Sequence, residues 1–119
     1  MTPRTKKRDG MAIDVSDLSQ KMVRAAAGSL KGKWPSIKDF AEAEFKKLAE
    51  TLALIVRLKA EGKITEDQAK LHLDIQKNTT RMVLLTAEGL ALLPVEAAIN
   101  AALKVVRDAI NSAIGFALI

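Results

Sequence analysis

The sequence has no cysteine and no tyrosine, and its 119 residues include one histidine, one tryptophan and three phenylalanines. Without cysteine the chain can form no disulfide scaffold and no thiolate metal site, and it offers no thiol nucleophile. The single histidine, His72, is the only candidate base for a Ser-His-Asp arrangement, and no Gly-x-Ser-x-Gly elbow surrounds any serine. We therefore expect a protein that is not an enzyme.

Motifs for a metal or a cofactor are also missing from the sequence. A di-iron bundle needs a glutamate three positions before a histidine, and here that position is Ala69. Glu88 and Glu96 are acids in apolar surroundings, but two carboxylates without histidine make a poor transition-metal site. The glycines at positions 28 and 32 have the wrong spacing for a phosphate-binding loop. We expect no bound metal and no cofactor.

Long apolar runs are absent as well. The longest stretch without a charge, Ala109 to Ile119, falls short of the roughly 20 apolar residues that a membrane-spanning helix requires. Near the N-terminus, Asp14 and Asp17 interrupt the apolar stretch that a secretory signal would need. We expect a cytoplasmic protein, or one held within an assembled particle.

The net charge of +5 belongs entirely to the first 33 residues, which contain eight basic and three acidic side chains, whereas residues 34–119 contain eleven of each. We expect residues 1–12 to form a basic, disordered arm and residues 13–119 a single helical domain. A basic arm on a neutral body suits contact with a polyanion or an acidic protein face. The candidate contact residues are Arg4, Lys6, Lys7, Arg8, Lys21 and Arg24. A solubilising tail explains the same charges, and Met11 leaves an internal start open.

Helix punctuation divides the first half of the chain. Asp14 or Ser16 can cap a helix that runs to about Lys31. The Trp34-Pro35 pair ends that helix, because a residue before proline is disfavoured in the α region. Ser36 is then expected to begin the next helix, with Asp39 as a weaker form of the capping box.

The clearest signal is an antiparallel helical hairpin formed by residues of about 37–61 and 66–92. Gly62 suits the end of the first helix, and Thr65 with Gln68 forms a capping box at the start of the second. The apolar stripe expected to face the core of the second helix is Leu71, Ile75, Met82, Leu85 and Leu92. Pro94 either kinks this helix or opens another one from about residue 95 to 116.

The alanine-rich C-terminal segment has its polar residues in one narrow stripe, made of Glu96, Asn100, Lys104, Arg107, Asp108 and Asn111. A helix that is apolar on most sides is normally buried on most sides. Since a chain this short has few elements with which to surround such a helix, we expect self-association. The predicted oligomer interface is Ile99, Ala102, Leu103, Val106, Ile110, Ala113, Ile114 and Phe116.

Polar residues also interrupt the apolar face expected for residues 66–92. Asn78, Thr79 and Thr86 lie on or beside that face, with Gln76 and Thr80 nearby. Buried polar residues of this kind fix the register between packed helices, although they could also line a small-molecule pocket. We favour the first role. His72, on the boundary of the same face, is expected to be solvated or hydrogen-bonded rather than catalytic.

Together these features predict an all-α fold in which the hairpin belongs to a three- or four-helix bundle completed by self-association. The leading functional interpretation is a non-enzymatic, homo-oligomeric assembly subunit, such as a component of a phage or secretion assembly. One alternative is a nucleic-acid-associated protein that acts through its basic N-terminal arm. A second alternative is a peripheral membrane-surface protein, with no transmembrane span, that combines the basic arm with the apolar C-terminal tail.

Overall fold

The structure, a computed structural model, describes residues 14–87 and 89–119, so the arm predicted over residues 1–12 lies outside the described residues. In the described part, the chain forms α-helices and one short 3-10 helix, and no strand. The elements are α2 (Val15–Leu30), η1 (Lys31–Lys33), α3 (Trp34–Ala60), α4 (Glu66–Ala87) and α5 (Leu92–Ile114). The all-α prediction is confirmed.

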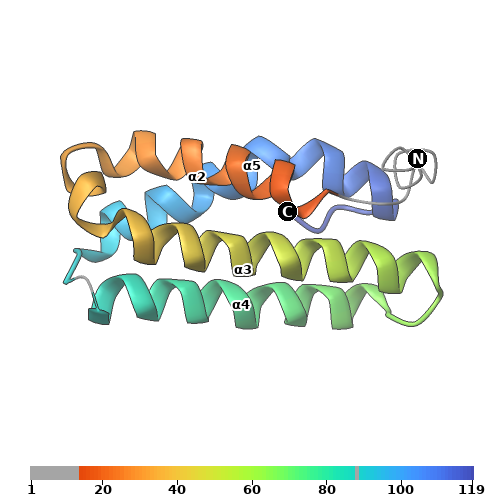
Figure 1. The fold of residues 1–119 in the computed structure, drawn as a ribbon. Coiled ribbons are helices and arrows are strands. Elements are labelled where there is room, and N and C mark those ends of the chain that lie inside the picture. The colour runs from red at the N-terminus through yellow and green to blue at the C-terminus, as the bar shows by residue number, and fades with distance from the viewer. Residues whose placement is uncertain (1–13, 88) are drawn as a thin grey trace.

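Consecutive α-helices run in opposite directions along one long axis (Figure 1). The most extensive contact joins α2 to α5, and α3 packs against α2, α4 and α5. Helix α4 packs mainly on α3 and makes a smaller contact with α5. Because α4 lies at the edge of the molecule, one of its sides faces solvent.

Aliphatic side chains from all four α-helices fill the core. Helix α2 contributes the apolar residues at helical spacing that its sequence predicts, and Leu18, Met22, Ala26 and Leu30 are all buried. Each such side chain contributes about 1.5–3 kcal/mol when it is fully buried, although alanine contributes less. The largest completely buried side chains are Met22, Phe45, Leu48, Leu52, Ile55, Leu84, Ile99 and Ile110.

Local hydrogen bonds confirm two of the predicted helix ends. The Asp14 carboxylate caps α2 by accepting hydrogen bonds from the amides of Ser16 at 3.0 Å and Asp17 at 3.3 Å. At the start of α4, the Gln68 amide donates to the Thr65 hydroxyl at 3.1 Å, and the Thr65 amide donates to the Gln68 side chain at 2.9 Å. This reciprocal pair is the predicted capping box.

The turn between α3 and α4 is built around Gly62, which has a φ of +69°. The Gly62 amide donates to the Lys59 carbonyl at 3.1 Å, and the Lys63 amide donates to the Leu58 carbonyl at 2.8 Å. These two bonds form a Schellman motif, in which glycine at the left-handed position costs no side-chain strain. They satisfy carbonyls that the end of α3 would otherwise leave without partners.

The predicted start of α3 at Ser36 is wrong. The helix begins at Trp34, and Ser36 lies inside its first turn, where its hydroxyl donates to the Lys33 carbonyl at 2.9 Å. Pro35 is compatible with this position because the first turn of a helix has no use for its missing N–H, and its fixed φ suits a helix.

Pro94 opens a separate helix instead of kinking a continuous one. Helix α4 ends at Ala87 and α5 begins at Leu92, which places Pro94 in the first turn of α5. Ala91 occupies the N-cap position and makes no side-chain capping bond. The first turn of α5 is therefore stabilised by the fixed φ of the proline and by burial of Val95, without a polar cap.

The core face predicted for α4 is wrong for most of its residues. Leu71, Ile75 and Met82 are 60%, 57% and 58% exposed, and Leu92, now in α5, is 52% exposed; only Leu85 is partly buried against the core. The core side of α4 is formed instead by Ala69, Leu73, Thr80 and Leu84. Side chains two positions apart in an α-helix point in directions that differ by about 200°, so Leu71 and Leu73 lie on nearly opposite faces. Helix α4 thus has two apolar faces, and α3 covers the one with smaller side chains.

The residues predicted to form an oligomer interface on α5 lie instead inside the single chain. Six of them are buried, and Ala113 and Phe116 pack against the core. The expectation that a short chain could not surround this helix fails, because α2 and α3 together cover its apolar sides. The eight residues are Ile99, Ala102, Leu103, Val106, Ile110, Ala113, Ile114 and Phe116.

One carboxylate is buried in α3. The side chain of Glu44 is 7% exposed, and its Oε2 lies 3.1 Å from the Lys47 ammonium, one helical turn away. Its Oε1 has no hydrogen-bond partner among the described residues. Burying an incompletely paired carboxylate is costly, so we expect this residue to lower the stability of the fold.

We predict that Glu44→Met will raise the free energy of unfolding by about 1 kcal/mol, because methionine fills similar space without a charge to desolvate. Urea denaturation monitored by circular dichroism measures the change. Glu50→Met, at an exposed position of the same helix, is the matched control and should change stability by less than about 0.5 kcal/mol. A loss of stability in the Glu44 variant alone would show that the carboxylate has a stabilising partner.

Candidate functional site

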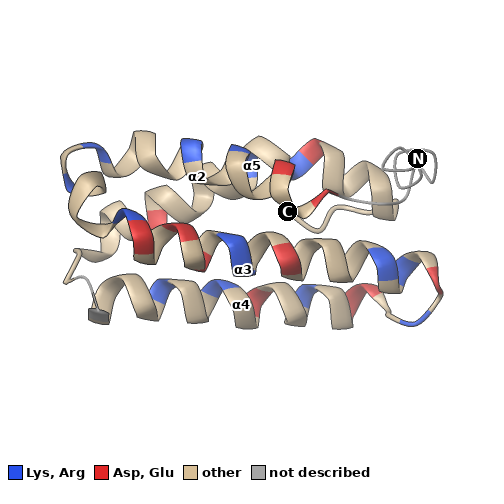
Figure 2. Ribbon diagram, viewed as in Figure 1, with Lys and Arg blue, Asp and Glu red and all other residues tan. Residues whose placement is uncertain are grey.

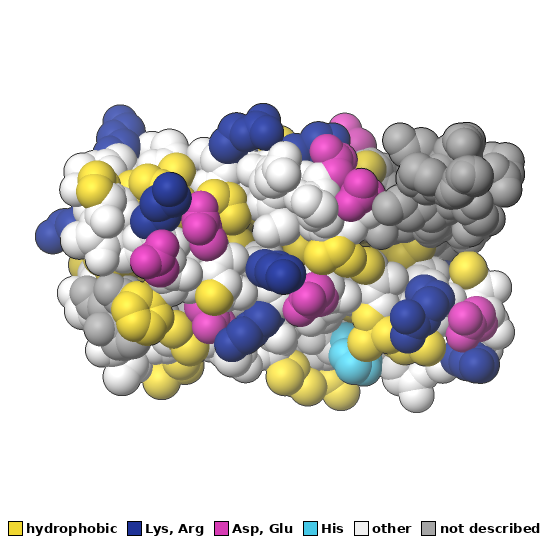
Figure 3. Space-filling view, in the orientation of Figure 1, with side chains coloured by type: hydrophobic (Ala, Val, Ile, Leu, Met, Phe, Trp, Pro, Cys, Tyr) yellow, Lys and Arg dark blue, Asp and Glu magenta, His cyan; other side chains and the backbone are white. Residues whose placement is uncertain are grey.

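The solvent-facing side of α4 carries a regularly spaced group of exposed apolar side chains. Leu71, Ile75 and Met82, which we call the outer stripe, are separated by four and seven residues, so they lie on one side of the helix. With the 1.5 Å rise of an α-helix, the stripe is roughly 17 Å long. Figure 3 shows hydrophobic side chains along the edge of the molecule formed by α4.

An ion pair fixes the second half of α4 against α5. Arg81 and Glu96 pair through Nε and Oε2, and Arg81 Nη2 lies 3.4 Å from Glu96 Oε1. Arg81 Nη1 also donates to the side-chain oxygen of Asn78. Both charged side chains are about a quarter to a third exposed, so solvent screens the pair less than a fully exposed one. This fork-shaped contact orients the outer stripe relative to the rest of the chain.

A short polar ladder fixes α4 against α3. The Thr51 hydroxyl donates to the Gln76 side chain at 3.5 Å, and the Gln76 amide donates to the hydroxyl of Thr80 at 3.4 Å. Thr80 is completely buried, so the ladder penalises any slip that would separate these groups. Of these two bonds only that between Thr51 and Gln76 joins two helices, so the register role predicted for the polar residues of α4 falls to Gln76.

The other polar residues of that prediction face solvent. Asn78, Thr79 and Thr86 are exposed, and the Thr79 hydroxyl donates to the Ile75 carbonyl of its own helix at 3.0 Å. The prediction that they lie buried between helices of the chain is wrong. They lie beside the outer stripe instead, where they interrupt its apolar surface.

His72 is exposed on α4, as expected, beside a shallow depression of about 320 Å³ that Leu58, Ile64 and Leu71 also line. Across the described residues, no three histidine or acidic side chains are close enough together to hold a metal ion.

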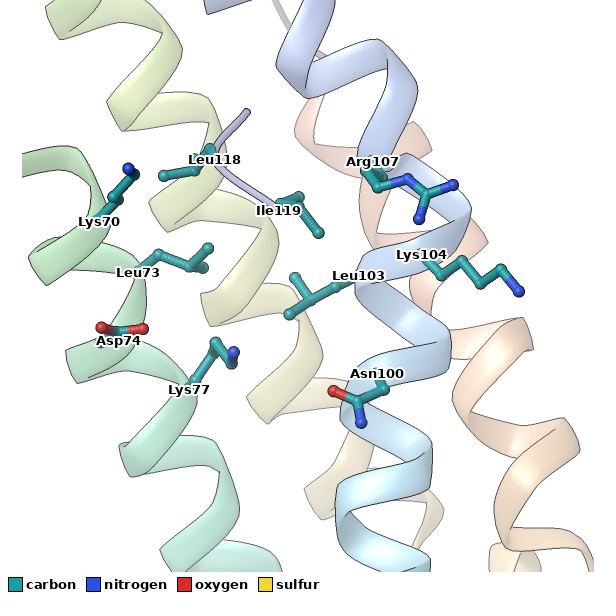
Figure 4. A pocket seen from close by; sticks show the side chains of 10 residues that line it. All are labelled: Lys70, Leu73, Asp74, Lys77, Asn100, Leu103, Lys104, Arg107, Leu118 and Ile119. Carbon is teal, nitrogen blue, oxygen red and sulfur yellow. The ribbon is translucent and has the colours of Figure 1, made fainter. Parts of the chain in front are cut away.

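A groove between α4 and α5 is a candidate ligand site that four basic side chains line. Its volume is about 500 Å³, within the ~300–1,000 Å³ typical of small-molecule sites. Figure 4 shows α4 on one side, α5 on the other and the C-terminal tail between them. This α4/α5 groove is lined by Lys70, Leu73, Asp74, Lys77, Asn100, Leu103, Lys104, Arg107, Leu118 and Ile119.

The C-terminal tail is held in the groove by Asn111. The chain turns back at Gly115, which has a φ of +82°. The Asn111 side-chain oxygen then accepts hydrogen bonds from the amides of Leu118 at 2.9 Å and Ile119 at 3.1 Å, and its amide donates to the Ile119 carbonyl at 3.3 Å. One side chain therefore holds both tail residues that line the groove.

The polar stripe of α5 noted in the sequence explains these features. Glu96 pairs with Arg81, while Asn100, Lys104 and Arg107 line the groove, and Asn111 holds the tail. The groove could not be predicted from the sequence, because nothing in the sequence shows that this stripe faces Lys70 and Lys77 of α4.

The described residues of the predicted polyanion contact do not form a continuous basic surface. Arg4, Lys6, Lys7 and Arg8 lie outside the described residues. Lys21 pairs with Asp17 at 3.2 Å, and Arg24 lines a shallow depression between α2 and α3 together with Asp39 and Glu42. Figure 2 shows acidic and basic residues interspersed along the helices, particularly on α3.

In the described residues, no helix combines the length and the apolar character needed to cross a membrane.

We predict that Asn111→Ala will release the tail, because it removes three hydrogen bonds, and will lower the free energy of unfolding by about 1–2 kcal/mol. Hydrogen exchange followed by NMR should show that the amides of Leu118 and Ile119 lose protection. Asn100→Ala, on the same helix but without bonds to the tail, is the control. Unchanged protection of both amides in the Asn111 variant would contradict this account of the tail.

No protein-family model, curated protein or solved structure matches this chain.

Proposed function

We propose that the protein is a non-enzymatic structural subunit: a four-helix antiparallel bundle that pairs with a second copy through the outer stripe of α4. The observation that carries this proposal is the exposure of Leu71, Ile75 and Met82, each more than half accessible, along one side of one helix. Single exposed hydrophobic residues are ordinary on protein surfaces, whereas an aligned group of them supports an interaction site.

The spacing of the stripe supports a helical partner. Positions 71, 75, 78 and 82 alternate steps of four and three residues, which is the spacing of a coiled-coil contact. Asn78 occupies one of these positions, and a polar residue there favours one register and one oligomeric state at some cost in stability. This arrangement favours a specific partner helix over a lipid surface, which would not select a register.

A second copy of α4 is a suitable partner because the stripe is complementary to itself. In an antiparallel pairing centred between Gln76 and Lys77, Leu71 faces Met82 of the second copy and Ile75 faces Asn78 of the second copy. The flanking positions then bring Asp74 near Arg81 of the second copy, twice by symmetry, so that Arg81 would add this contact to its ion pair with Glu96 of its own chain. Opposite charges at such positions select orientation.

The pairing is expected to be weak. A stable interface buries about 800 Å² on each partner, which three half-exposed side chains cannot supply. Leu92 and Leu93, at the end of the molecule where α4 ends and α5 begins, add further exposed apolar surface (Figure 1). Reversible contacts of this size suit an assembly in which many weak interfaces act together.

We predict that Ile75→Glu will raise the dissociation constant of self-association by at least about tenfold, since it replaces an apolar contact with a charge. Sedimentation velocity over a range of protein concentrations measures this constant. Val105→Glu, at an exposed apolar position of α5, is the matched control and should leave it unchanged. A full-length protein that stays monomeric up to millimolar concentration, or a variant that associates normally, would contradict the proposed interface.

Contact with nucleic acid through the N-terminal arm is a second candidate function, favoured by the confinement of the net charge of +5 to residues 1–33. If the arm neutralises about five phosphates, duplex affinity should fall by about 500-fold between roughly 50 and 200 mM salt. Fluorescence anisotropy with a labelled duplex measures this dependence. Deletion of residues 2–10 should abolish binding, and full binding after the deletion would exclude the arm as the contact.

A further inference from the structure

The α4/α5 groove gathers positive charge on a body that is otherwise almost balanced. Residues 14–119 contain fifteen basic and thirteen acidic side chains, whereas the groove is lined by four basic residues and one acid. The basic residues are Lys70 and Lys77 on α4 and Lys104 and Arg107 on α5. The groove therefore concentrates more net charge than the whole of residues 14–119.

Most of these cations have no internal counter-charge. Within the described residues, Lys70, Lys77 and Lys104 make no salt bridge, and Arg107 pairs only with its exposed neighbour Asp108, at 3.5 Å. Asp74 is the single acidic side chain that lines the groove, and it is exposed. Positive charges placed together without partners repel one another, and an anionic ligand would relieve that repulsion.

The floor of the groove is apolar. Leu73 from α4 and Leu103 from α5 are each 4% exposed, and the tail adds Leu118 and Ile119 as a third wall. In Figure 4 these four side chains lie in the space between the helices, and Lys77 extends from α4 towards α5, while the side chains of Lys104 and Arg107 extend from α5 on the side away from α4. The groove thus combines an aliphatic interior with basic residues on both flanking helices, which we call its cationic rim.

We infer that the α4/α5 groove binds a free single-chain anionic amphiphile, such as a medium-chain fatty acid, with its chain over Leu73 and Leu103 and its headgroup at the cationic rim. Both parts of the ligand are required by the site: the leucines offer nothing to a small hydrated anion, and the cations disfavour a neutral or positive amphiphile. The inference does not depend on self-association, because the outer stripe lies on a different side of α4.

The test is titration of the full-length protein with decanoate below its micelle concentration, followed by NMR. Decanoate should shift the resonances of Leu73, Leu103 and Leu118. Decyltrimethylammonium, with the same chain and a positive head, and inorganic phosphate, with no chain, should each bind at least about tenfold more weakly. Equal binding of the two amphiphiles would overturn the inference, as would decanoate shifts confined to residues outside the groove.

Charge variants test the rim without disturbing the core. Lys77→Gln combined with Lys104→Gln should weaken decanoate binding by about five- to tenfold, because each removes one charge contact at the rim. Lys33→Gln combined with Lys38→Gln removes the same charge from exposed positions elsewhere and should have no effect. Identical affinities of the two double variants for decanoate would overturn the inference that the cationic rim binds the headgroup.

A membrane lipid offers the same chemistry as a free amphiphile, so the source of the ligand is tested separately. Vesicles containing phosphatidylglycerol should bind the wild-type protein and the groove double variant equally, or not at all. Vesicle binding that is lost in the groove variant, without any binding of decanoate, would overturn the assignment to a free amphiphile and assign the groove to a membrane surface.

Discussion

Burial of α5 against α2 and α3 is the constraint on which the rest of the structure depends. Ile99, Val106 and Ile110 are buried where α5 packs on α2 and α3, so the apolar side of α5 is covered within one chain. The rotation of α5 is thereby fixed, and its polar stripe can face only solvent and α4. This one choice places Glu96 against Arg81 and Asn111 against the returning tail.

The packing of helix α4 depends on the surface that the other three helices leave open to it. Its Ala69, Leu73, Thr80 and Leu84 side completes the core, and two polar connections to other helices, Arg81 to Glu96 and Thr51 to Gln76, hold it in position. Larger apolar side chains are left facing water on the opposite side. An incomplete contact with α5 leaves the groove that the tail partly fills. The two proposed binding surfaces are therefore different sides of one helix at the edge of the molecule.

The sequence predicts what local interactions determine. Asp14 and the Thr65–Gln68 pair were predictable because their hydrogen bonds join residues at most three positions apart. The inward side of α4 was not, because two apolar stripes share the helix and the neighbours decide between them. Hydrophobicity alone predicts the wrong inward side, since Leu71, Ile75 and Met82 are more hydrophobic than Ala69 and Thr80. Burial of α5 was predicted, but whether α2 and α3 or a second copy would cover it is a question of tertiary packing.

Helix α5 is buried within the chain while the outer side of α4 is accessible, and the absence of cysteine makes this difference directly measurable. Met82→Cys and Val106→Cys each introduce a single thiol, whose rate of reaction with a maleimide can be measured at low protein concentration. The thiol at position 82 should react at nearly the rate of an unfolded control, and the thiol at position 106 should be protected by at least about 100-fold. Comparable rates at the two positions, or protection at position 82 alone, would contradict this arrangement of the two helices.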